Sequence, residues 1–99
     1  MLAARIESNK APFILDVRTA NERQQGYIPG SAHITHSEFP SRLVELPADK
    51  EAEIVVYCYS GKRAQLIEEL LLREGFMRVS DLQGHWKQWV RDGHPINND

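Results

Sequence analysis

The stretch IVVYCYSGKRA, residues 54–64, runs from an uninterrupted apolar segment into a glycine that is followed by two cations. Residues 54–57 predict a strand buried on both faces of a sheet, because a strand exposed on one face alternates apolar with polar side chains. Cys58, the only cysteine of the chain, stands where this strand should end. The stretch therefore raises the question of why a single thiol follows a buried strand.

The residues after this stretch change to helical spacing. Ala64, Ile67 and Leu71 fall on one stripe of a helix, and Gly75 is a typical helix stop. Upstream, residues 13–17, FILDV, repeat the pattern of a strand buried on both faces. Strands and helices that alternate along the chain predict an α/β fold with a mainly parallel sheet.

Three further segments complete this prediction. A third short strand is expected over residues 77–82, and the apolar side chains of residues 86–90 predict a last helix. Residues 37–40, SEFP, read as a capped helix start, since Pro40 is tolerated in a first turn. The apolar residues from Phe39 to Leu46 recur at helical spacing, so we expect this helix to bury one face.

Length and composition limit the class of protein. A chain of 99 residues with 41% hydrophobic content predicts one domain over residues 1–99. A net charge of −2 gives no reason to expect nucleic acid or an anionic membrane as a partner. No stretch approaches the roughly 18 apolar residues of a membrane span, and the N-terminus lacks the apolar core of a secretory signal. With one cysteine and so no internal disulfide, we expect a cytoplasmic protein.

The position of Cys58 favours chemistry over packing. Ligands of open parallel sheets bind beyond the carboxyl ends of the strands, where the following helices point their N-termini. A helix that begins near Lys62 or Arg63 would turn its unpaired amides and positive dipole end toward the sulfur and favour a thiolate. Gly61 lets the backbone turn sharply beside a bound group. A cysteine that is only a small buried hydrophobic residue is the alternative, but it needs no such neighbours.

Three blocks of the sequence, taken together and in this order, resemble one family. They are ILDVRTANERQQGYIPGSAHI (residues 14–34), CYSGKR (residues 58–63) and LQGHWKQWVRDGHPI (residues 82–96). Over nearly its whole length the chain resembles a single-domain rhodanese, a sulfurtransferase. The resemblance implies a three-layer fold, in which helices flank both faces of a mainly parallel central sheet.

The resemblance also implies a mechanism. Cys58 would be the catalytic nucleophile and would carry sulfane sulfur as a persulfide, taken from a donor such as thiosulfate and passed to a thiol, cyanide or protein acceptor. The substrate-binding cradle would consist of Tyr59, Ser60, Gly61, Lys62 and Arg63. Arg63 matches the family motif, whereas Lys62 stands at a variable position and is assigned to the anionic donor by its charge alone.

Three residues of the first block are expected to be structural and near the site. Asp16 and Arg18 would tie the end of their strand to the following helix through an acid such as Glu22. Neither a metal nor an organic cofactor is implied. Four histidines without a cysteine or carboxylate cluster make a poor metal site, although His33 and His36 have the spacing of a metal pair. The expected partners are a small anionic sulfur donor and a protein or low-molecular-weight thiol acceptor.

Two other functions stay open. A non-enzymatic persulfide carrier or docking module would receive sulfur from a partner enzyme without turning over a small donor. A cysteine-dependent phosphatase or arsenate reductase is less favoured, because four residues separate Cys58 from Arg63 and the phosphatase loop is one residue longer.

The chain also departs from the family pattern. Tyr27 replaces a frequent histidine, and His85 replaces the second glycine of the closing block; we expect neither to touch the chemistry, although His85 can reshape the site entrance. Family domains usually begin with a further strand, and this chain starts about where their first helix does. An outer strand that is missing or replaced would expose a sheet edge, which allows either a monomer or a weak homodimer.

Overall fold

The described part of the chain folds around a parallel sheet. A computed structural model describes residues 2–39 and 41–98. The strands are β1 (Phe13–Asp16), β2 (Ala32–His33), β3 (Glu53–Tyr57) and β4 (Arg78–Asp81). The α-helices are α1 (Leu2–Glu7), α2 (Ala20–Gln24), α3 (Lys62–Arg73) and α4 (His85–Arg91), and two 3₁₀-helices are η1 (His36–Glu38) and η2 (Leu43–Glu45).

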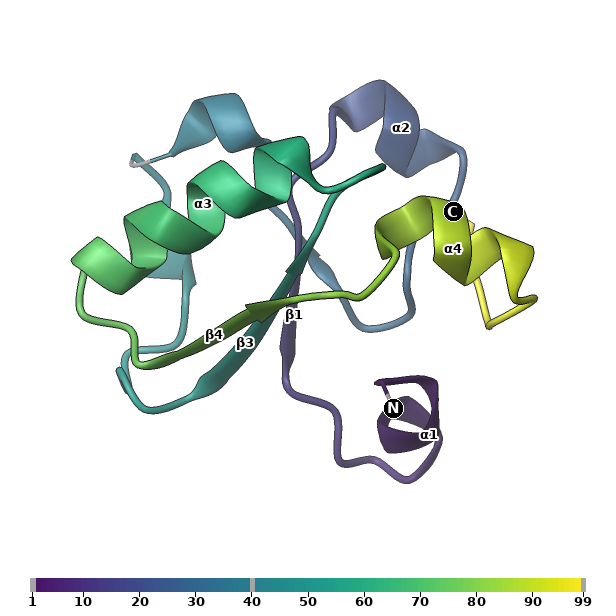
Figure 1. The fold of residues 1–99 in the computed structure, drawn as a ribbon, viewed down its shortest axis with the longest axis horizontal. Coiled ribbons are helices and arrows are strands. Elements are labelled where there is room, and N and C mark those ends of the chain that lie inside the picture. The colour runs from purple at the N-terminus through teal and green to yellow at the C-terminus, as the bar shows by residue number, and fades with distance from the viewer. Residues whose placement is uncertain (1, 40, 99) are drawn as a thin grey trace.

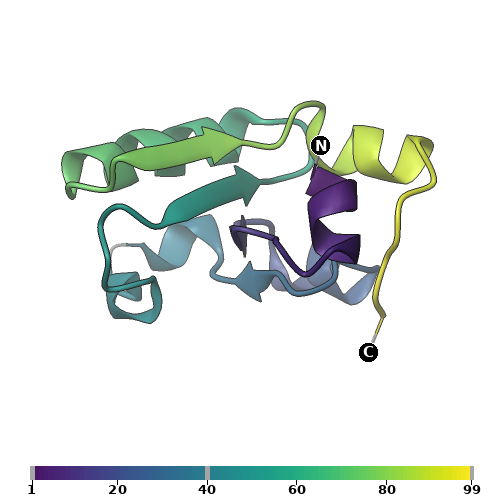
Figure 2. The same cartoon turned by 90° about the horizontal axis from the view of Figure 1, so that it is seen from below.

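The sheet has the strand order β2-β1-β3-β4, and neighbouring strands are parallel. In Figure 2 the arrows of β3 and β4 point the same way. In the register of the two central strands, Leu15 lies opposite Val56 and Asp16 lies opposite Tyr57. The residues that follow β1 and β3 therefore meet at one edge of the sheet, as Cys58 requires if it is to lie in a ligand site.

Two apolar layers cover the two faces of the sheet. Figure 1 shows α3 on one side of the strands and both α1 and α4 on the other. Alternate residues of β3 serve the two layers: Val56 packs in the cluster that contains Ile67 of α3, and Tyr57 packs in the cluster that contains Trp86 of α4. The prediction of a three-layer α/β fold with helices on both faces is confirmed.

The helix predicted from residue 37 onward is wrong. Two short 3₁₀-helices, η1 and η2, occupy this region instead. Phe39 is extended, with φ −78° and ψ 145°, because the residue before a proline is disfavoured in the helical region. Pro40 itself lies outside the described residues. The apolar spacing nevertheless buries side chains, since Leu46 belongs to the core that α3 covers and Leu43 packs against it.

Within residues 2–39 and 41–98, none of the helices is long and apolar enough to cross a membrane.

Candidate active site

Cys58 begins the loop that joins β3 to α3, and its sulfur already has a polar partner. The backbone N–H of Gly61 donates a hydrogen bond to Cys58 Sγ at 3.0 Å. Gly61 is the N-cap of α3 and has φ +117°, a conformation that side chains other than hydrogen rarely tolerate. The prediction that the helix begins near Lys62 or Arg63 is confirmed, because α3 starts at Lys62.

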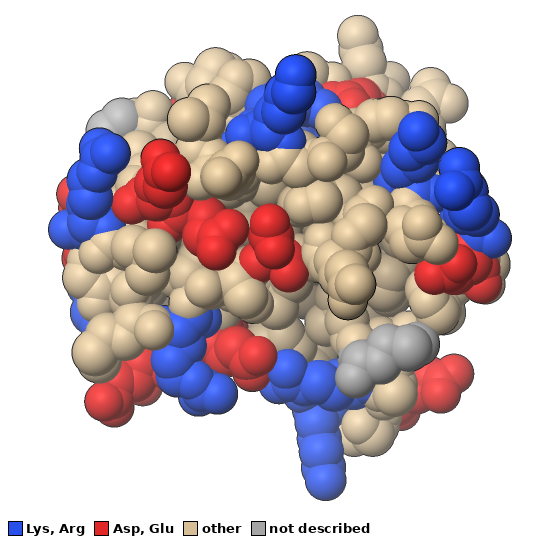
Figure 3. All heavy atoms as spheres, viewed as in Figure 1, with Lys and Arg blue, Asp and Glu red and all other residues tan. Residues whose placement is uncertain are grey.

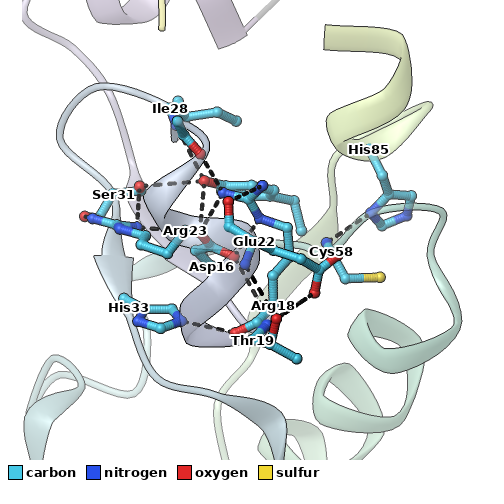
Figure 4. A network of polar contacts seen from close by, with 12 residues as sticks. Asp16, Arg18, Thr19, Glu22, Arg23, Ile28, Ser31, His33, Cys58 and His85 are labelled. Carbon is cyan, nitrogen blue, oxygen red and sulfur yellow. Dashed lines mark hydrogen bonds and ion pairs between the residues drawn. The ribbon is translucent and has the colours of Figure 1, made fainter. Parts of the chain in front are cut away.

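The cysteine is 1% exposed and belongs to the apolar cluster beneath α3. Its sulfur is nevertheless the acceptor of the Gly61 amide, which distinguishes it from a cysteine that only fills space. Figure 4 shows the sulfur pointing away from the polar network around Asp16 and Arg18. Of the cradle predicted around it, Tyr59 and Ser60 are exposed on the loop, and Lys62 is exposed at the first position of α3.

The first turn of α4 holds the loop from the opposite side. Trp86 N–H donates to the carbonyl of Cys58 at 3.0 Å, and Lys87 N–H donates to the carbonyl of Tyr59 at 3.2 Å. Cys58 N–H in turn donates to His85 Nδ1 at 3.3 Å. The expectation was that His85 would not touch the chemistry but could reshape the site entrance; in the structure its ring contacts the backbone of Cys58. The sequence marked His85 as a departure from a glycine pattern that can reshape the site entrance, but it could not predict the contact with the loop, which depends on tertiary structure.

The guanidinium of Arg63 forms an ion pair with the carboxylate of Glu22. Its Nη1 donates to Glu22 Oε1 at 2.6 Å and its Nη2 donates to Oε2 at 3.0 Å. The hydrogen bond from Arg63 lowers the pKa of Glu22 to about 2. Glu22 also completes a capping box with Thr19 at the start of α2, so the pair ties α2 to the cysteine loop. Arg63, one of the two cations in the predicted substrate-binding cradle, is thus already balanced by a carboxylate, whereas Lys62 stands exposed beside it.

Asp16 and Arg18 form a buried pair at the carboxyl end of β1. Arg18 Nε donates to Asp16 Oδ1 at 2.9 Å and its Nη2 donates to Oδ2 at 2.8 Å. The Arg18 side chain is 1% exposed, and Nη2 also donates to the carbonyl of Gly26 at 2.8 Å. The structure places both residues in the frame of the site. The acid that binds Arg18 is Asp16, whereas Glu22 offers it only a backbone carbonyl at 3.4 Å.

Two aromatic residues extend this buried network (Figure 4 shows its polar part). The hydroxyl of Tyr57 donates to Asp16 Oδ2 at 3.1 Å and accepts from Ile28 N–H at 3.1 Å. Burial raises the pKa of Tyr57 to about 12. Trp86 stacks on Tyr57 and lies 4.3 Å from the Arg18 guanidinium carbon. Sequence spacing placed Tyr57 and Trp86 only in strand and helix cores, because spacing does not report hydrogen bonds across the sheet.

Two cavities flank the loop. One, of about 260 Å³, is lined by Arg18, Glu22, Gln25, Tyr59 and Trp86. The other, of about 590 Å³, lies between α3 and the end of β4, with Ser60, Gly61, Lys62 and His85 among its lining residues. Acidic side chains gather over α3 in Figure 3, and Glu68, Glu69 and Asp81 line this second cavity. The loop is therefore bordered by one aromatic cavity and one acidic cavity.

The described part of the chain contains no group of three His, Cys, Asp or Glu side chains arranged to hold a metal ion. His33 Nε2 is instead 2.7 Å from the carbonyl oxygen of Arg18, within hydrogen-bond distance. Its partner in the predicted pair spacing, His36, lies in η1.

The comparisons with known proteins agree with this architecture. A family model described as Rhodanese-like domain matches residues 1–92. A sulfurtransferase of Allochromatium vinosum is 34% identical over 95 residues, which cover 96% of this chain and 87% of that protein. Thiosulfate sulfurtransferase GlpE of Stutzerimonas stutzeri is 30% identical over 81 residues, which cover 82% of this chain and 72% of that protein.

A solved structure is similar as well. The crystal structure of a rhodanese-related protein from Thermoplasma volcanium matches with a TM-score of 0.83 at 30% identity, covering 98% of this chain and 95% of that one. The resemblance that three sequence blocks suggested is confirmed over nearly the whole chain. This chain, with its cysteine loop held at the carboxyl edge of a parallel sheet, belongs to the rhodanese-like domain family.

Proposed function

We propose that this protein is a sulfurtransferase that moves sulfane sulfur from a small anionic donor such as thiosulfate to a thiol, cyanide or protein acceptor, through a persulfide on Cys58. The observation that carries the proposal is the hydrogen bond from the Gly61 amide to Cys58 Sγ at 3.0 Å. An amide aimed at a sulfur stabilises negative charge there, as donors of an oxyanion hole do. The names of the two sulfurtransferase relatives support the same reaction.

The reaction consists of two displacements at sulfur. The Cys58 thiolate attacks the outer sulfur of thiosulfate; a bond forms between the two sulfur atoms, and the S–S bond of the donor breaks with its electron pair leaving on sulfite. The resulting persulfide carries one additional sulfur. An acceptor thiolate or cyanide then attacks that terminal sulfur, and Cys58 leaves as the thiolate, so no external oxidant or reductant is needed.

The two cations near the loop, Lys62 and Arg63, have different roles in the proposed reaction. Lys62 is exposed at the start of α3 and is free to approach the sulfonate of an incoming donor. Arg63 donates to both oxygens of Glu22, so its first contribution is to fix the loop. Its second is a positive electrostatic potential near the sulfur, which the Glu22 carboxylate partly neutralises. Lys62→Ala should therefore raise the KM for thiosulfate more than it changes kcat.

Intact-protein mass spectrometry tests the proposal. Fully reduced protein treated with thiosulfate should gain one sulfur atom, and a reductant should remove it. Cys58→Ser is the matched control, because it changes a single atom of the nucleophile. No added sulfur on the reduced wild-type protein, or the same gain on Cys58→Ser, would contradict the proposed function.

Turnover separates the enzyme from the carrier. An enzyme forms thiocyanate from thiosulfate and cyanide, and Cys58→Ser abolishes the product. A carrier takes up sulfur only from a partner enzyme and forms no thiocyanate from these two compounds. Phosphate release from an aryl ester would instead favour a phosphatase. A lone free thiol suits a reducing compartment, so the proposal includes a cytoplasmic location, which subcellular fractionation tests.

A further inference from the structure

His85 has an unusual backbone for its residue type. Its φ is +53°, in the left-handed region where a residue with a Cβ is strained and glycine is not. The side chain is almost entirely buried, with 7% of the residue exposed. A strained backbone that is kept at a site suggests that the side chain has a function there. The observed conformation of His85 therefore motivates a search for its role.

The imidazole touches both ends of the turn that encloses the sulfur. Nδ1 accepts from the N–H of Cys58 at 3.3 Å. On the other side, a Cβ placed on Gly61 would lie 2.9 Å from His85 Nε2, so the ring packs directly against the Gly61 backbone. Gly61 is the residue whose N–H donates to Cys58 Sγ. The ring therefore lies against the two residues that set the direction of that hydrogen bond.

The protonation state of the ring decides whether this contact holds. Nδ1 accepts a hydrogen bond only when it carries no proton, so the contact assigns the proton of the neutral ring to Nε2. Nε2 lies 3.5 Å from Asp81 Oδ2 at the end of β4. Burial lowers the pKa of His85, and the Asp81 carboxylate opposes that shift. A second proton, on Nδ1, would face the Cys58 N–H and break the contact.

The charged and titratable groups around the ring come from every element packed against it. The loop contributes the Cys58 thiol, and the end of β4 contributes Asp81. The cavity that His85 lines also receives Lys62, Glu68 and Glu69 from α3.

We propose that His85 is a positioning residue for sulfur transfer: its neutral imidazole holds the Cys58–Gly61 turn so that the Gly61 amide faces the sulfur, and protonation of the ring releases the turn. The inference rests on the proposed function, because the turn serves a reaction only if Cys58 accepts sulfur. It extends that function by coupling the cradle to pH through a residue outside the loop.

Two substitutions separate this role from a merely structural one. His85→Gly removes the ring and relieves the positive φ, so the fold should be kept. His85→Asn places an amide oxygen where Nδ1 is, tolerates a left-handed backbone and does not titrate. The first variant lacks the acceptor, whereas the second keeps an acceptor that no proton can block.

The experiment measures the rate of persulfide formation with thiosulfate in the three proteins between about pH 5 and about pH 8. At neutral pH, His85→Gly should react about tenfold more slowly than wild type, the worth of one hydrogen bond, and His85→Asn should react within about twofold of wild type. Toward acid pH the wild-type rate should fall more steeply than that of His85→Asn. The three proteins are compared at each pH, so that any pH effect they share does not enter the comparison.

A second readout does not depend on activity. The backbone amide resonance of Cys58, followed by NMR, should titrate with the His85 ring in wild type and should lose this transition in His85→Asn. An unchanged rate in His85→Gly, or an equally steep acid loss in His85→Asn, would overturn the role of His85 while leaving the proposed function intact. If wild type accepted no sulfur, the proposed function would fail, and with it the role assigned to His85.

Discussion

The carboxylate of Glu22 binds the guanidinium of Arg63 through two hydrogen bonds, of 2.6 and 3.0 Å, across 41 residues of sequence. Glu22 belongs to α2 and Arg63 to the first turn of α3, so the pair joins the helix that follows β1 to the helix that follows the cysteine loop. Both side chains are more than two-thirds buried. The arginine of the loop is therefore part of the frame before any donor arrives.

We predict that this pair contributes to stability as a unit. Glu22→Gln and Arg63→Lys should each lower the free energy of unfolding by about 1–2 kcal/mol, because each leaves a partly buried charge with a weaker partner. The double variant should lose less than the sum, with a coupling of at least about 0.5 kcal/mol. Urea unfolding of the four proteins measures the cycle.

An exposed pair of the same chemistry provides the control. Arg42 binds Glu45 with a shortest distance of 2.6 Å, but its partner is 48% exposed. Glu45→Gln should cost less than about 0.5 kcal/mol, since exposed ion pairs are screened by water. A Glu22→Gln variant no less stable than Glu45→Gln would refute the structural role of the Glu22–Arg63 pair.

The same pair predicts how stability depends on pH. The hydrogen bond from Arg63 lowers the pKa of Glu22 from 4.5 to about 2 in the folded protein. The stabilisation is therefore fully present above pH 4.5 and is lost as the pH falls from 4.5 toward 2. Glu22→Gln has no carboxylate to protonate, so its unfolding free energy should change less over this interval. Parallel curves for the two proteins in denaturant titrations at several acid pH values would contradict the prediction.

The layers of the fold could be predicted from the sequence because buried strands and helices have characteristic spacings of apolar residues. Residues 54–57 and 13–15 are apolar on consecutive positions, and the structure buries β3 and β1 between two layers. The change of period after Gly61 placed the start of α3 correctly. The helix predicted from residue 37 onward failed because local steric restriction before a proline outweighed an apolar spacing that η1 and η2 also satisfy.

The sequence could not predict which polar groups meet. Glu22 was expected to connect Asp16 and Arg18 to the helix after their strand, but its side chain binds Arg63. Arg63 reaches Glu22 from the loop and helix that follow β3. The contact of His85 with Cys58 was not predicted, because it involves a positive φ at both Gly84 and His85. Such partners are set by the register of the sheet and by loop conformation, and neither leaves a periodic trace in one sequence.

The buried Asp16–Arg18 pair should be the most costly to break. Asp16→Asn leaves the Arg18 guanidinium, which is 1% exposed, without a negative partner. It also weakens the contacts of Tyr57 and Arg23 with the same carboxylate. We expect a loss of about 3–5 kcal/mol in unfolding free energy, the usual cost of a buried charge left alone.

A second variant distinguishes the lone charge from lost packing. Asp16→Asn combined with Arg18→Met removes the charge and keeps most of the side-chain volume, so it should be more stable than Asp16→Asn alone. Chemical unfolding at neutral pH compares the two. A single variant that loses less than about 1 kcal/mol would show that the buried arginine finds another partner.

Gly61 should tolerate no side chain, for two separable reasons. Its φ of +117° strains any residue with a Cβ, and a Cβ would come within 2.9 Å of His85 Nε2. Gly75 isolates the first reason, because it has φ +98° and nothing within 4 Å of its added Cβ. Gly75→Ala should therefore cost about 1–2 kcal/mol from the backbone alone, and Gly61→Ala should cost more.

Removing the imidazole should then recover the difference. In a His85→Gly background the steric conflict at residue 61 disappears, so Gly61→Ala should cost no more there than Gly75→Ala costs in wild type. Unfolding free energies from urea titration of these variants measure both terms. If Gly61→Ala were as mild as Gly75→Ala in the wild-type background, the ring would not press on the loop, and the close packing of His85 against the sulfur-binding turn would be refuted.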